Sequence, residues 1–275
     1  MSVSRRQFLV AMGGLGTGIY SWGIEPHRLE VVTRPLHVSR LPSALEGRTL
    51  AHLSDIHVGP RVDDAYVLDV FSHVCTLQPD IVVVTGDLIT YHSRVFEQME
   101  RVYCGFPKGR LATLGILGNH DYGESWARFK LADRVASIAG EHGITILRNE
   151  ICEVGGLQIV GLDDLWAGRF DPVRALADYD RNCAAIALSH NPDTADKRGW
   201  GDFEGWILSG HTHGGQCKPP FLPPPLLPVR NRRYTQGEFA LSGNRSMYIS
   251  RGIGHSLRVR FNVRPEVTLF ELRAV

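Results

Sequence analysis

The segment 80–85, with the sequence DIVVVT, constrains the fold of this chain more than any other. After its first residue it is continuously apolar and β-branched up to a final threonine, whereas a strand with one solvated face would alternate apolar and polar residues. Such a run is typical of a strand that is buried on both faces, in a parallel sheet covered on both sides. Pro79 precedes the segment, and Gly86 and Asp87 follow it. A chain built around this strand is predicted to be an α/β protein.

Other segments show the patterns of strands and helices around this one. A helical pattern over 63–77 begins at Asp63, a suitable N-cap, and ends before Pro79. A second helix is expected over 125–141. The other predicted strands are 29–38, 48–53, 111–117, 184–188, 206–208, 247–250 and 267–272. At 275 residues, the chain has the length of one large α/β unit rather than a string of modules.

Five of the predicted strands run directly into residues that can bind a metal ion. In chain order these residues are Asp55 and His57, then Asp87, then Asn119 with His120 and Asp121, then His190, and finally His211 and His213. Functional residues in open α/β sheets lie just beyond the carboxyl ends of the strands. The five strand ends are therefore predicted to converge on one site, although they are far apart in the sequence.

These five blocks resemble those of the calcineurin-like metallophosphoesterases, in which they occur in the same order. They are Asp-x-His at 55–57, Gly-Asp at 86–87, Gly-Asn-His-Asp at 118–121, His190, and Gly-His-Thr-His at 210–213. The resemblance runs from about Arg48 to the C-terminus. It implies an α/β fold with a two-sheet β-sandwich flanked by helices around a βαβαβ-type core. The expected organisation is a single domain over 29–275 that follows a separate segment, 1–25.

The resemblance also implies a centre with two metal ions, bridged by Asp87. The ligands that complete it are Asp55, His57 and His213 for the first ion, and Asn119, His190 and His211 for the second. Imidazole nitrogens combined with carboxylate and amide oxygens suit divalent ions of the manganese, iron and zinc kind. Mn²⁺ is the expected ion, and Fe or Zn are the alternatives. Residues 211 and 213 of an extended tip project in one direction, so two imidazoles can reach adjacent ions.

A hydroxide that bridges two cations is a strong nucleophile near neutral pH, and the cations also neutralise phosphoryl oxygens. The expected reaction is therefore phosphoester hydrolysis. His120 lies beside the ligand Asn119 but is not itself assigned as a ligand. It is expected to protonate the leaving alkoxide or to bind the developing phosphoryl charge. Asp121 is expected either to orient the His120 ring or to cap the next helix.

Two other functions are compatible with similar residues. A protein of this fold without catalysis would be a metal-binding interaction scaffold. Such scaffolds lose histidines, however, and here the ligand set is complete. A two-metal peptidase uses similar ligands but lacks the Gly-Asn-His-Asp arrangement at 118–121. The sequence therefore favours a hydrolase that acts as a phosphodiesterase or a pyrophosphatase.

Three further segments, 163–168, 210–216 and 264–268, resemble a bacterial group of twin-arginine-exported or membrane-associated phosphodiesterases. Some relatives in that group hydrolyse the pyrophosphate of UDP-diacylglucosamine, so a phosphodiester or a glycolipid diphosphate is the implied substrate. The loop 219–228, PPFLPPPLLP, contains six prolines and no charge, and it begins six residues after His213. It is expected to meet an acyl chain or a membrane surface, or else to be a rigid structural lid.

The charge balance gives no reason to expect nucleic acid as a partner, because 30 Lys and Arg face 29 Asp and Glu. The basic surplus lies at the C-terminal end, where ten Lys and Arg against three Asp and Glu leave 218–275 with a net charge of +7. Arg251, Arg258 and Arg264 in this part, together with Arg260, are candidates for holding substrate phosphates or anionic lipid headgroups. A solvated basic face is the alternative.

The segment 1–25 resembles a twin-arginine export leader. Arg5 and Arg6 precede a mildly apolar stretch that extends from Phe8 to Trp22 and is broken by glycines. As a helix this stretch would rise about 22 Å, short of a hydrocarbon core of about 30 Å. We expect export by the twin-arginine machinery to the periplasm or cell envelope, with the leader either cleaved or kept as a weak membrane anchor. A basic amphipathic helix is the alternative.

The five cysteines show neither the spacing of a disulfide framework nor that of a thiolate zinc site. We expect them to be mostly buried, as small apolar side chains often are. His52 lies within a predicted strand and is expected to be a core residue rather than a ligand.

Overall fold

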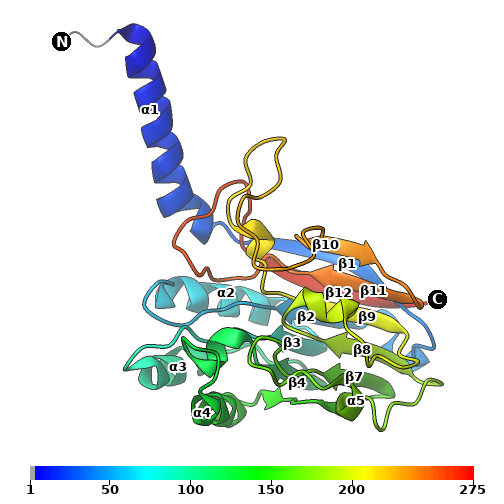
Figure 1. Cartoon of the computed structure of the whole chain (residues 1–275). Coiled ribbons are helices and arrows are strands. Elements are labelled where there is room, and N and C mark those ends of the chain that lie inside the picture. Colours follow the sequence, from blue (N-terminus) through cyan, green and yellow to red (C-terminus); the bar gives the residue numbers. More distant parts are fainter. Residues whose placement is uncertain (1–3) are drawn as a thin grey trace.

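The computed structural model describes residues 4–275, with the backbone alone for residues 8–11. Two six-stranded sheets pack face to face, and helices lie on the outside (Figure 1). In spatial order the first sheet consists of β1 (Glu30–Val38), β12 (Glu266–Ala274), β2 (Thr49–Leu53), β3 (Ile81–Thr85), β4 (Ala112–Ile116) and β5 (Thr145–Ile146). The second consists of β10 (Gly237–Ala240), β11 (Arg245–Ile249), β9 (Gly205–Ser209), β8 (Ala184–Leu188), β7 (Leu157–Gly161) and β6 (Glu150–Val154). The predicted two-sheet α/β sandwich is confirmed.

The packing of β3 explains why its sequence is continuously apolar. Val82 and Val84 belong to the core between the first sheet and its helices. Ile81 and Val83 belong to the core between the two sheets, which also contains Leu208 of β9. The strand therefore supplies two cores in alternation, and a polar residue at any of these four positions would be buried.

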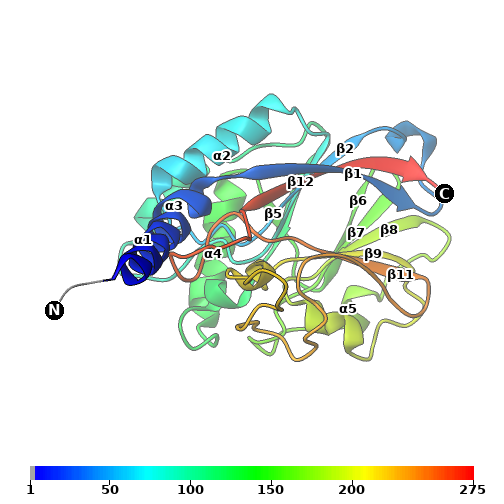
Figure 2. The same ribbon diagram turned by 90° about the horizontal axis from the view of Figure 1, so that it is seen from above.

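The helices cover the outer faces of both sheets (Figure 2). α2 (Asp64–Thr76), α3 (Val95–Tyr103) and α4 (Phe129–Glu141) cover the first sheet, and α5 (Pro172–Ala175) lies against the second. Asp63 caps α2 as predicted, because its carboxylate accepts a hydrogen bond from Ala65 N at 2.9 Å. α4 begins later than the predicted residue 125, since Trp126 has a φ of 56° and Arg128 is also outside the helical region.

The direction of the strands brings the predicted site residues to one end of the sandwich. β2, β3 and β4 are parallel neighbours, and so are β7, β8 and β9. Backbone hydrogen bonds also join the segments just beyond the strands. His57 N donates to Asp87 O at 2.9 Å, and Gly210 N donates to His190 O at 3.0 Å. Backbone hydrogen bonds alone thus hold the ends of these strands next to one another.

The N-terminal helix α1 (Arg5–Ile19) projects from the body of the molecule and continues into a π-helical turn, Tyr20–Ile24 (Figure 1). Arg260 N donates to Ser21 O at 2.9 Å, and Val263 N donates to Glu25 Oε1 at 2.6 Å, so the end of this segment is attached to the domain. Among residues 4–275, no helix combines the length and the apolar character needed to cross a bilayer. The first three residues of the predicted leader lie outside the described residues.

The prediction that the cysteines are mostly buried is wrong. Cys75 and Cys104 are exposed, and the other three are half-buried. In α2 the inward positions next to Cys75 are taken by Val74 and Phe71, which leaves the thiol on the outer face. His52, in contrast, is buried as predicted. Burial lowers the pKa of His52 to about 3.

Candidate metal centre

The five strand ends form one cluster of side chains that can bind metal ions. It consists of three overlapping groups, and within each group the potential ligand atoms lie within 4.8 Å of one another. The groups are Asp55, His57 and His213, then His57, Asp87 and His120, then Asp87, His190 and His211. Because His57 and Asp87 each belong to two groups, the three form one continuous arrangement.

Asp87 lies at the middle of this cluster. Its Oδ2 is 3.5 Å from His57 Nε2 and 3.2 Å from His190 Nε2. Its Oδ1 accepts a hydrogen bond from His120 N at 2.9 Å. His57 follows β2 of the first sheet, whereas His190 follows β8 of the second. One carboxylate therefore faces histidines from both sheets, which is the position that a bridging ligand requires.

Further imidazoles lie on either side of Asp87. His213 Nε2 is 3.1 Å from His57 Nε2 and 3.4 Å from Asp55 Oδ1. On the other side, His211 Nδ1 is 3.2 Å from His190 Nε2. His211 and His213 are two residues apart, yet they contribute to different ends of the cluster.

Hydrogen bonds fix the orientation of three of the rings. His190 Nδ1 donates to Thr85 O at 2.8 Å, and His211 Nε2 donates to Pro228 O at 2.8 Å. His57 Nδ1 lies 2.9 Å from Thr90 Oγ1. A backbone carbonyl can only accept a hydrogen bond, so the protonated nitrogen of His190 and of His211 is fixed and the other nitrogen can present its lone pair to a metal ion. In all three rings that second nitrogen faces the cluster.

Backbone strain occurs at the same residues. Left-handed φ values between 49° and 69° are found at Asp55, His57, Asp87, His211 and His213. This conformation is uncommon for residues other than glycine, and it persists at functional sites where the surrounding structure enforces it. The packing is close as well, since a Cβ at Gly210 would lie 1.8 Å from Ser54 Oγ. The fold therefore tolerates strain to bring these side chains together.

The donor atoms fit divalent cations. Asn119 Oδ1 and His213 Nδ1 are buried without a hydrogen-bond partner in the described chain. Buried polar atoms usually have partners, so unpaired ones beside clustered imidazoles and carboxylates point to a ligand. Nitrogen and oxygen donors without thiolate are the set that manganese, iron and zinc ions accept.

Residues 48–215, more than half of the chain, match the family described as calcineurin-like phosphoesterase. The chain belongs to this family. It is 32% identical to the uncharacterized metallophosphoesterase YkuE of Bacillus subtilis, over 99% of this chain and 98% of that protein. It is 31% identical to the phosphodiesterase YaeI of Escherichia coli, over 98% of this chain and 99% of that protein. Its identity to the UDP-2,3-diacylglucosamine pyrophosphatase LpxG of Chlamydia trachomatis is 27%, over 92% of each chain.

The charge states in this calcineurin-like phosphoesterase centre follow from burial and from Asp87. Burial alone would raise the pKa of Asp87, but His190 and His120 outweigh it and hold the pKa well below its ordinary value. Burial lowers the pKa of His57 and His213 well below the usual range, so both rings are neutral near pH 7. Burial also lowers the pKa of His190, but the Asp87 carboxylate outweighs burial and raises this pKa to about 10.

His120 and Asp121, the predicted catalytic residues, have different surroundings. The His120 ring is partly exposed and packs edge-on against His57, with ring centroids 4.9 Å apart. The buried Asp121 carboxylate accepts hydrogen bonds from Gly118 N at 2.8 Å and Ile89 N at 3.0 Å. Asp121 therefore holds the backbone of the turn that carries His120. The expectation that Asp121 caps the next helix is wrong, because the N-cap residue of α4 is Arg128 and no side chain caps that helix. The expectation that Asp121 orients the His120 ring stays a prediction.

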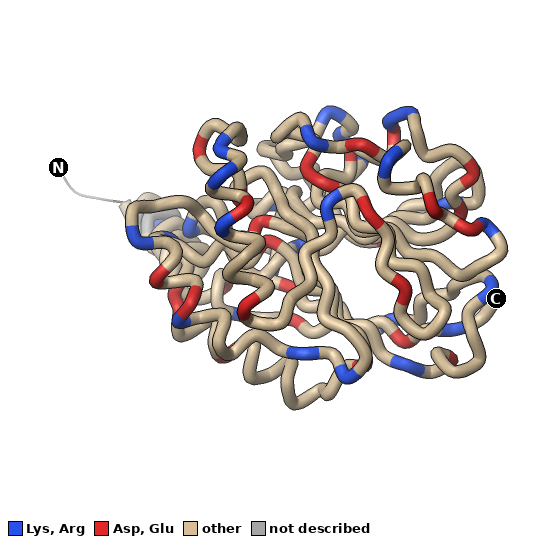
Figure 3. The backbone as a smooth tube through the Cα atoms, turned by 90° about the horizontal axis from the view of Figure 1, so that it is seen from below, with Lys and Arg blue, Asp and Glu red and all other residues tan. Residues whose placement is uncertain are grey.

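The C-terminal arginines do not form one group. Arg251 pairs with Glu30 at 3.0 Å and with Glu266, so its guanidinium joins parts of the fold. A contact of Arg251 with substrate phosphate stays a prediction. Arg258 and Arg264 are exposed and stay candidates. Over the chain as a whole, Lys and Arg are interspersed with Asp and Glu (Figure 3).

Sequence reasoning missed an aromatic contact beside the centre. Trp166 packs edge-on against His211, with ring centroids 4.4 Å apart, and Trp126 lies against Trp166 at 4.5 Å. Trp166 belongs to the segment 163–168, which is part of the resemblance to the bacterial phosphodiesterase group. That segment could therefore have indicated a residue near the site. Nothing in the local sequence relates Trp126 to His211.

Proposed function

We propose that this calcineurin-like phosphoesterase hydrolyses phosphodiesters or pyrophosphates with two divalent ions. The observation that carries this proposal is the position of Asp87 between His57 and His190, with a ring nitrogen of each directed at the same carboxylate oxygen. A shared carboxylate between two sets of nitrogen and oxygen donors suits two-metal phosphoester hydrolysis. The complete ligand set also argues for catalysis rather than a binding scaffold.

We assign the residues around Asp87 to the two ligand sets expected from the sequence. With Asp87, one ion would be held by Asp55, His57 and His213, and the other by Asn119, His190 and His211. Ions bound there would activate water and neutralise the charge on phosphoryl oxygens. The mixed nitrogen and oxygen donors support Mn²⁺, with Fe or Zn as the alternatives.

His120 is the proposed proton donor or phosphate-binding group. Its ring lies against His57 at the edge of the cluster and is partly exposed, so substrate can reach it. Its backbone nitrogen donates to Asp87, and Asp121 holds the same turn, so the ring is carried on a fixed backbone. From this position it would protonate the leaving oxygen or stabilise the phosphoryl charge.

The relatives support a substrate with substituents on both sides of the reacting phosphoryl group. One is named a phosphodiesterase and another a UDP-2,3-diacylglucosamine pyrophosphatase. We propose a phosphodiester or a glycolipid diphosphate as the substrate class of this chain. Arg258 and Arg264 stay candidates for contacts with its phosphates.

We further propose that the protein works in the cell envelope. The segment 1–25 would direct it to the twin-arginine machinery through Arg5 and Arg6, and 29–275 would be exported as one folded domain. The arginine pair and the apolar stretch after it support this localisation. A retained leader would add contact with the membrane surface, whereas a cleaved one would leave the domain in the periplasm. Mass spectrometry of the protein from the envelope fraction would distinguish the two forms.

A panel of phosphate esters with Mn²⁺ present tests the proposed reaction. We expect bis-nitrophenyl phosphate to be hydrolysed faster than nitrophenyl phosphate, and UDP-diacylglucosamine to be hydrolysed as well. Cyclic nucleotides complete the panel as diesters without acyl chains. Faster hydrolysis of the monoester would contradict the assignment to diesters. Binding of metal without turnover of any ester would favour the scaffold.

A further inference from the structure

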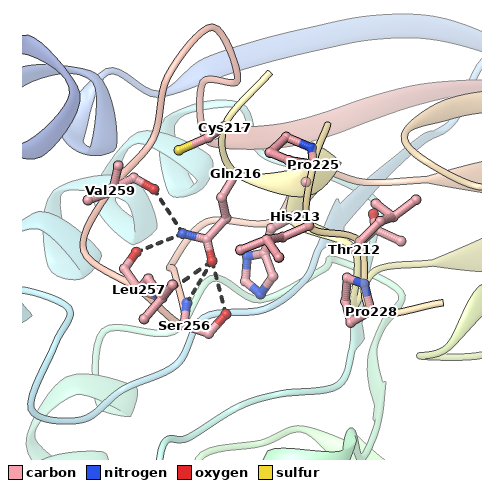
Figure 4. Close-up of a pocket in the computed structure, with 12 residues that line it drawn as sticks. Thr212, His213, Gln216, Cys217, Pro225, Pro228, Ser256, Leu257 and Val259 are labelled. Carbon is pink, nitrogen blue, oxygen red and sulfur yellow. Dashed lines mark hydrogen bonds between the residues drawn. The ribbon is translucent and has the colours of Figure 1, made fainter. Parts of the chain in front are cut away.

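A cavity of about 530 Å³ lies beside the metal centre. One wall contains the end of the polyproline loop, 225–228, and the opposite wall is formed by Ser256, Leu257 and Val259 (Figure 4). His213 lies between these walls, as the close-up shows. Because His213 Nε2 is also 3.4 Å from Asp55 Oδ1, a single imidazole ring belongs both to the cavity and to the metal centre.

The interior of this His213 cavity is mainly apolar. Leu226, Leu227, Leu257 and Val259 are among the side chains that line it. The carboxamide of Gln216 is one of the polar groups of the lining, and it is already hydrogen-bonded. Its Nε2 donates to Leu257 O at 2.7 Å and Val259 O at 2.9 Å, and its Oε1 accepts from Ser256 Oγ at 2.9 Å. Gln216 thus shapes the second wall and leaves little polar surface for a hydrophilic ligand.

The entrance of the cavity exposes apolar surface. Leu226 is 71% exposed and Leu257 is 58% exposed, whereas Leu227 is 8% exposed. Because both the entrance and the interior of the cavity are apolar, an alkyl chain can enter and bury its methylene groups against Leu227 and its neighbours. The volume lies within the 300–1,000 Å³ that small-molecule sites occupy.

We propose that the His213 cavity binds an alkyl chain that is covalently part of the phosphoester substrate. This proposal rests on the proposed function, because it needs a phosphoryl group at the centre and a hydrocarbon substituent next to it. Binding of the chain is uniform in the ground state and the transition state, so it lowers KM and raises kcat/KM. The cavity would then select lipid-like esters over short ones with the same reacting group.

Two esters with the same leaving group test this selection. Methyl nitrophenyl phosphate and dodecyl nitrophenyl phosphate release the same nitrophenolate and differ only in the chain. We expect kcat/KM to be about tenfold or more higher for the dodecyl ester below its micelle concentration, because burial of a few methylene groups suffices for this factor. Equal values would overturn the proposal. Absence of turnover of both esters would instead count against the proposed function.

Variants test whether side chains of the two cavity walls cause the preference for the dodecyl ester. Leu226→Ser and Leu257→Ser should reduce the ratio of the two kcat/KM values towards one. Leu222→Ser is the matched control, since Leu222 is 59% exposed in the same loop but is not among the cavity residues. A loop that is only a structural lid would give equal losses on both esters, and a ratio that falls as much in L222S as in L226S would also contradict the proposal.

Protection of a cysteine provides a measurement that does not depend on turnover. Cys217 lines the cavity and is half-buried, whereas Cys75 and Cys104 are exposed on α2 and after α3. In protein prepared without added metal, dodecylphosphocholine should slow the alkylation of Cys217 by N-ethylmaleimide several-fold and leave the other two unchanged. Glycerophosphocholine, which lacks the chain, should protect none of them. Protection of Cys217 combined with equal turnover of the two esters would mean that the cavity takes a lipid other than the substrate, which would overturn the proposal.

Discussion

The strand β3 has a buried aspartate at each end, and the two differ in their partners. Asp80, just before the strand, is 2% exposed and Asp87, just after it, is 1% exposed. Asp80 accepts hydrogen bonds from Thr49 N at 2.9 Å, Arg110 at 2.9 Å and Arg48 at 3.2 Å. Asp87 faces the imidazoles of His57 and His190.

Burial therefore does not distinguish a structural carboxylate from a functional one, but the chemistry of the partners does. A guanidinium is permanently charged and has no lone pair for a metal ion. The ion pairs of Asp80 therefore stabilise the fold and do not form a metal site. An imidazole can lose its proton and bind a cation, so the Asp87 end can accept metal ions. A change at Asp87 should consequently affect metal binding and turnover, whereas a change at Asp80 should affect the stability of the fold.

The largest effect is expected from Asp87→Asn. An amide in this position loses the negative charge that faces both sets of ligands, so binding of both ions and turnover of bis-nitrophenyl phosphate should fall together. Elemental analysis after reconstitution with manganese measures the first effect, and the rate of nitrophenolate release measures the second. A variant that kept both ions would show that another residue forms the bridge.

The next largest effect is expected from His120→Ala. This change should leave the metal content intact and reduce turnover by about 10²- to 10⁴-fold, as for loss of a general acid or charge stabiliser. The loss should be smaller for nitrophenyl esters, whose leaving group needs little protonation. If good and poor leaving groups show equal losses, His120 binds phosphate and does not donate a proton.

An intermediate effect is expected from Thr90→Val. The Thr90 hydroxyl lies 2.9 Å from His57 Nδ1 and helps to set the direction of the ring. Loss of such a supporting hydrogen bond typically costs about 10- to 100-fold in metal affinity or activity. Titration with manganese at a fixed pH would measure the change. Unaltered affinity would mean that packing against His120 and His213 is sufficient to orient His57.

The smallest effect on activity, but a clear effect on stability, is expected from Asp80→Asn. Loss of charged hydrogen bonds at this buried position should lower the free energy of unfolding by about 1–3 kcal/mol. Burial raises the pKa of Asp80, but Thr49 and the two arginines outweigh it and lower the pKa below the ordinary value. A lowered folded-state pKa means that the stabilisation is present above about pH 4 and is lost as the pH falls further.

Urea denaturation of the Asp80→Asn variant and the parent protein at several pH values tests this expectation. The difference between them should be constant near neutral pH and should shrink below about pH 4. Turnover of bis-nitrophenyl phosphate should be nearly unchanged, because Asp80 lies at the opposite end of β3. A large loss of activity in a folded variant would contradict the separation of the two ends.

The strands that carry the site were predictable because each is a short apolar run with a sharp end. The first four residues of β3, Ile81–Val84, alternate between two cores, and this leaves a continuous pattern in the sequence. β7 was not predicted, since Gln158 interrupts its run, although its carboxamide donates to Asp180 O at 2.8 Å. α3 was missed because it is short and Arg94 provides no side-chain cap. In both cases the stabilising contacts come from other parts of the fold.

The clustering of the His and Asp side chains was predictable from the blocks at the strand ends, whereas the other contacts of the predicted site residues were not. The pairing of Arg251 with Glu30 joins residues that are 221 positions apart, and no local pattern indicates it. The left-handed backbone of Asp55, His57 and Asp87 is likewise enforced by the assembled fold. In the His213 cavity, Gln216 is hydrogen-bonded to Ser256, which is 40 positions away in the sequence.

The number of ions bound per chain tests the central claim most directly. The protein would be stripped with a chelator, reconstituted with excess Mn²⁺, separated from free ions and analysed by elemental analysis against a protein standard. We predict two equivalents of manganese per chain, with hydrolysis of bis-nitrophenyl phosphate restored as the second equivalent binds. One equivalent or less in a folded, reconstituted protein would contradict a centre in which Asp87 joins two ions.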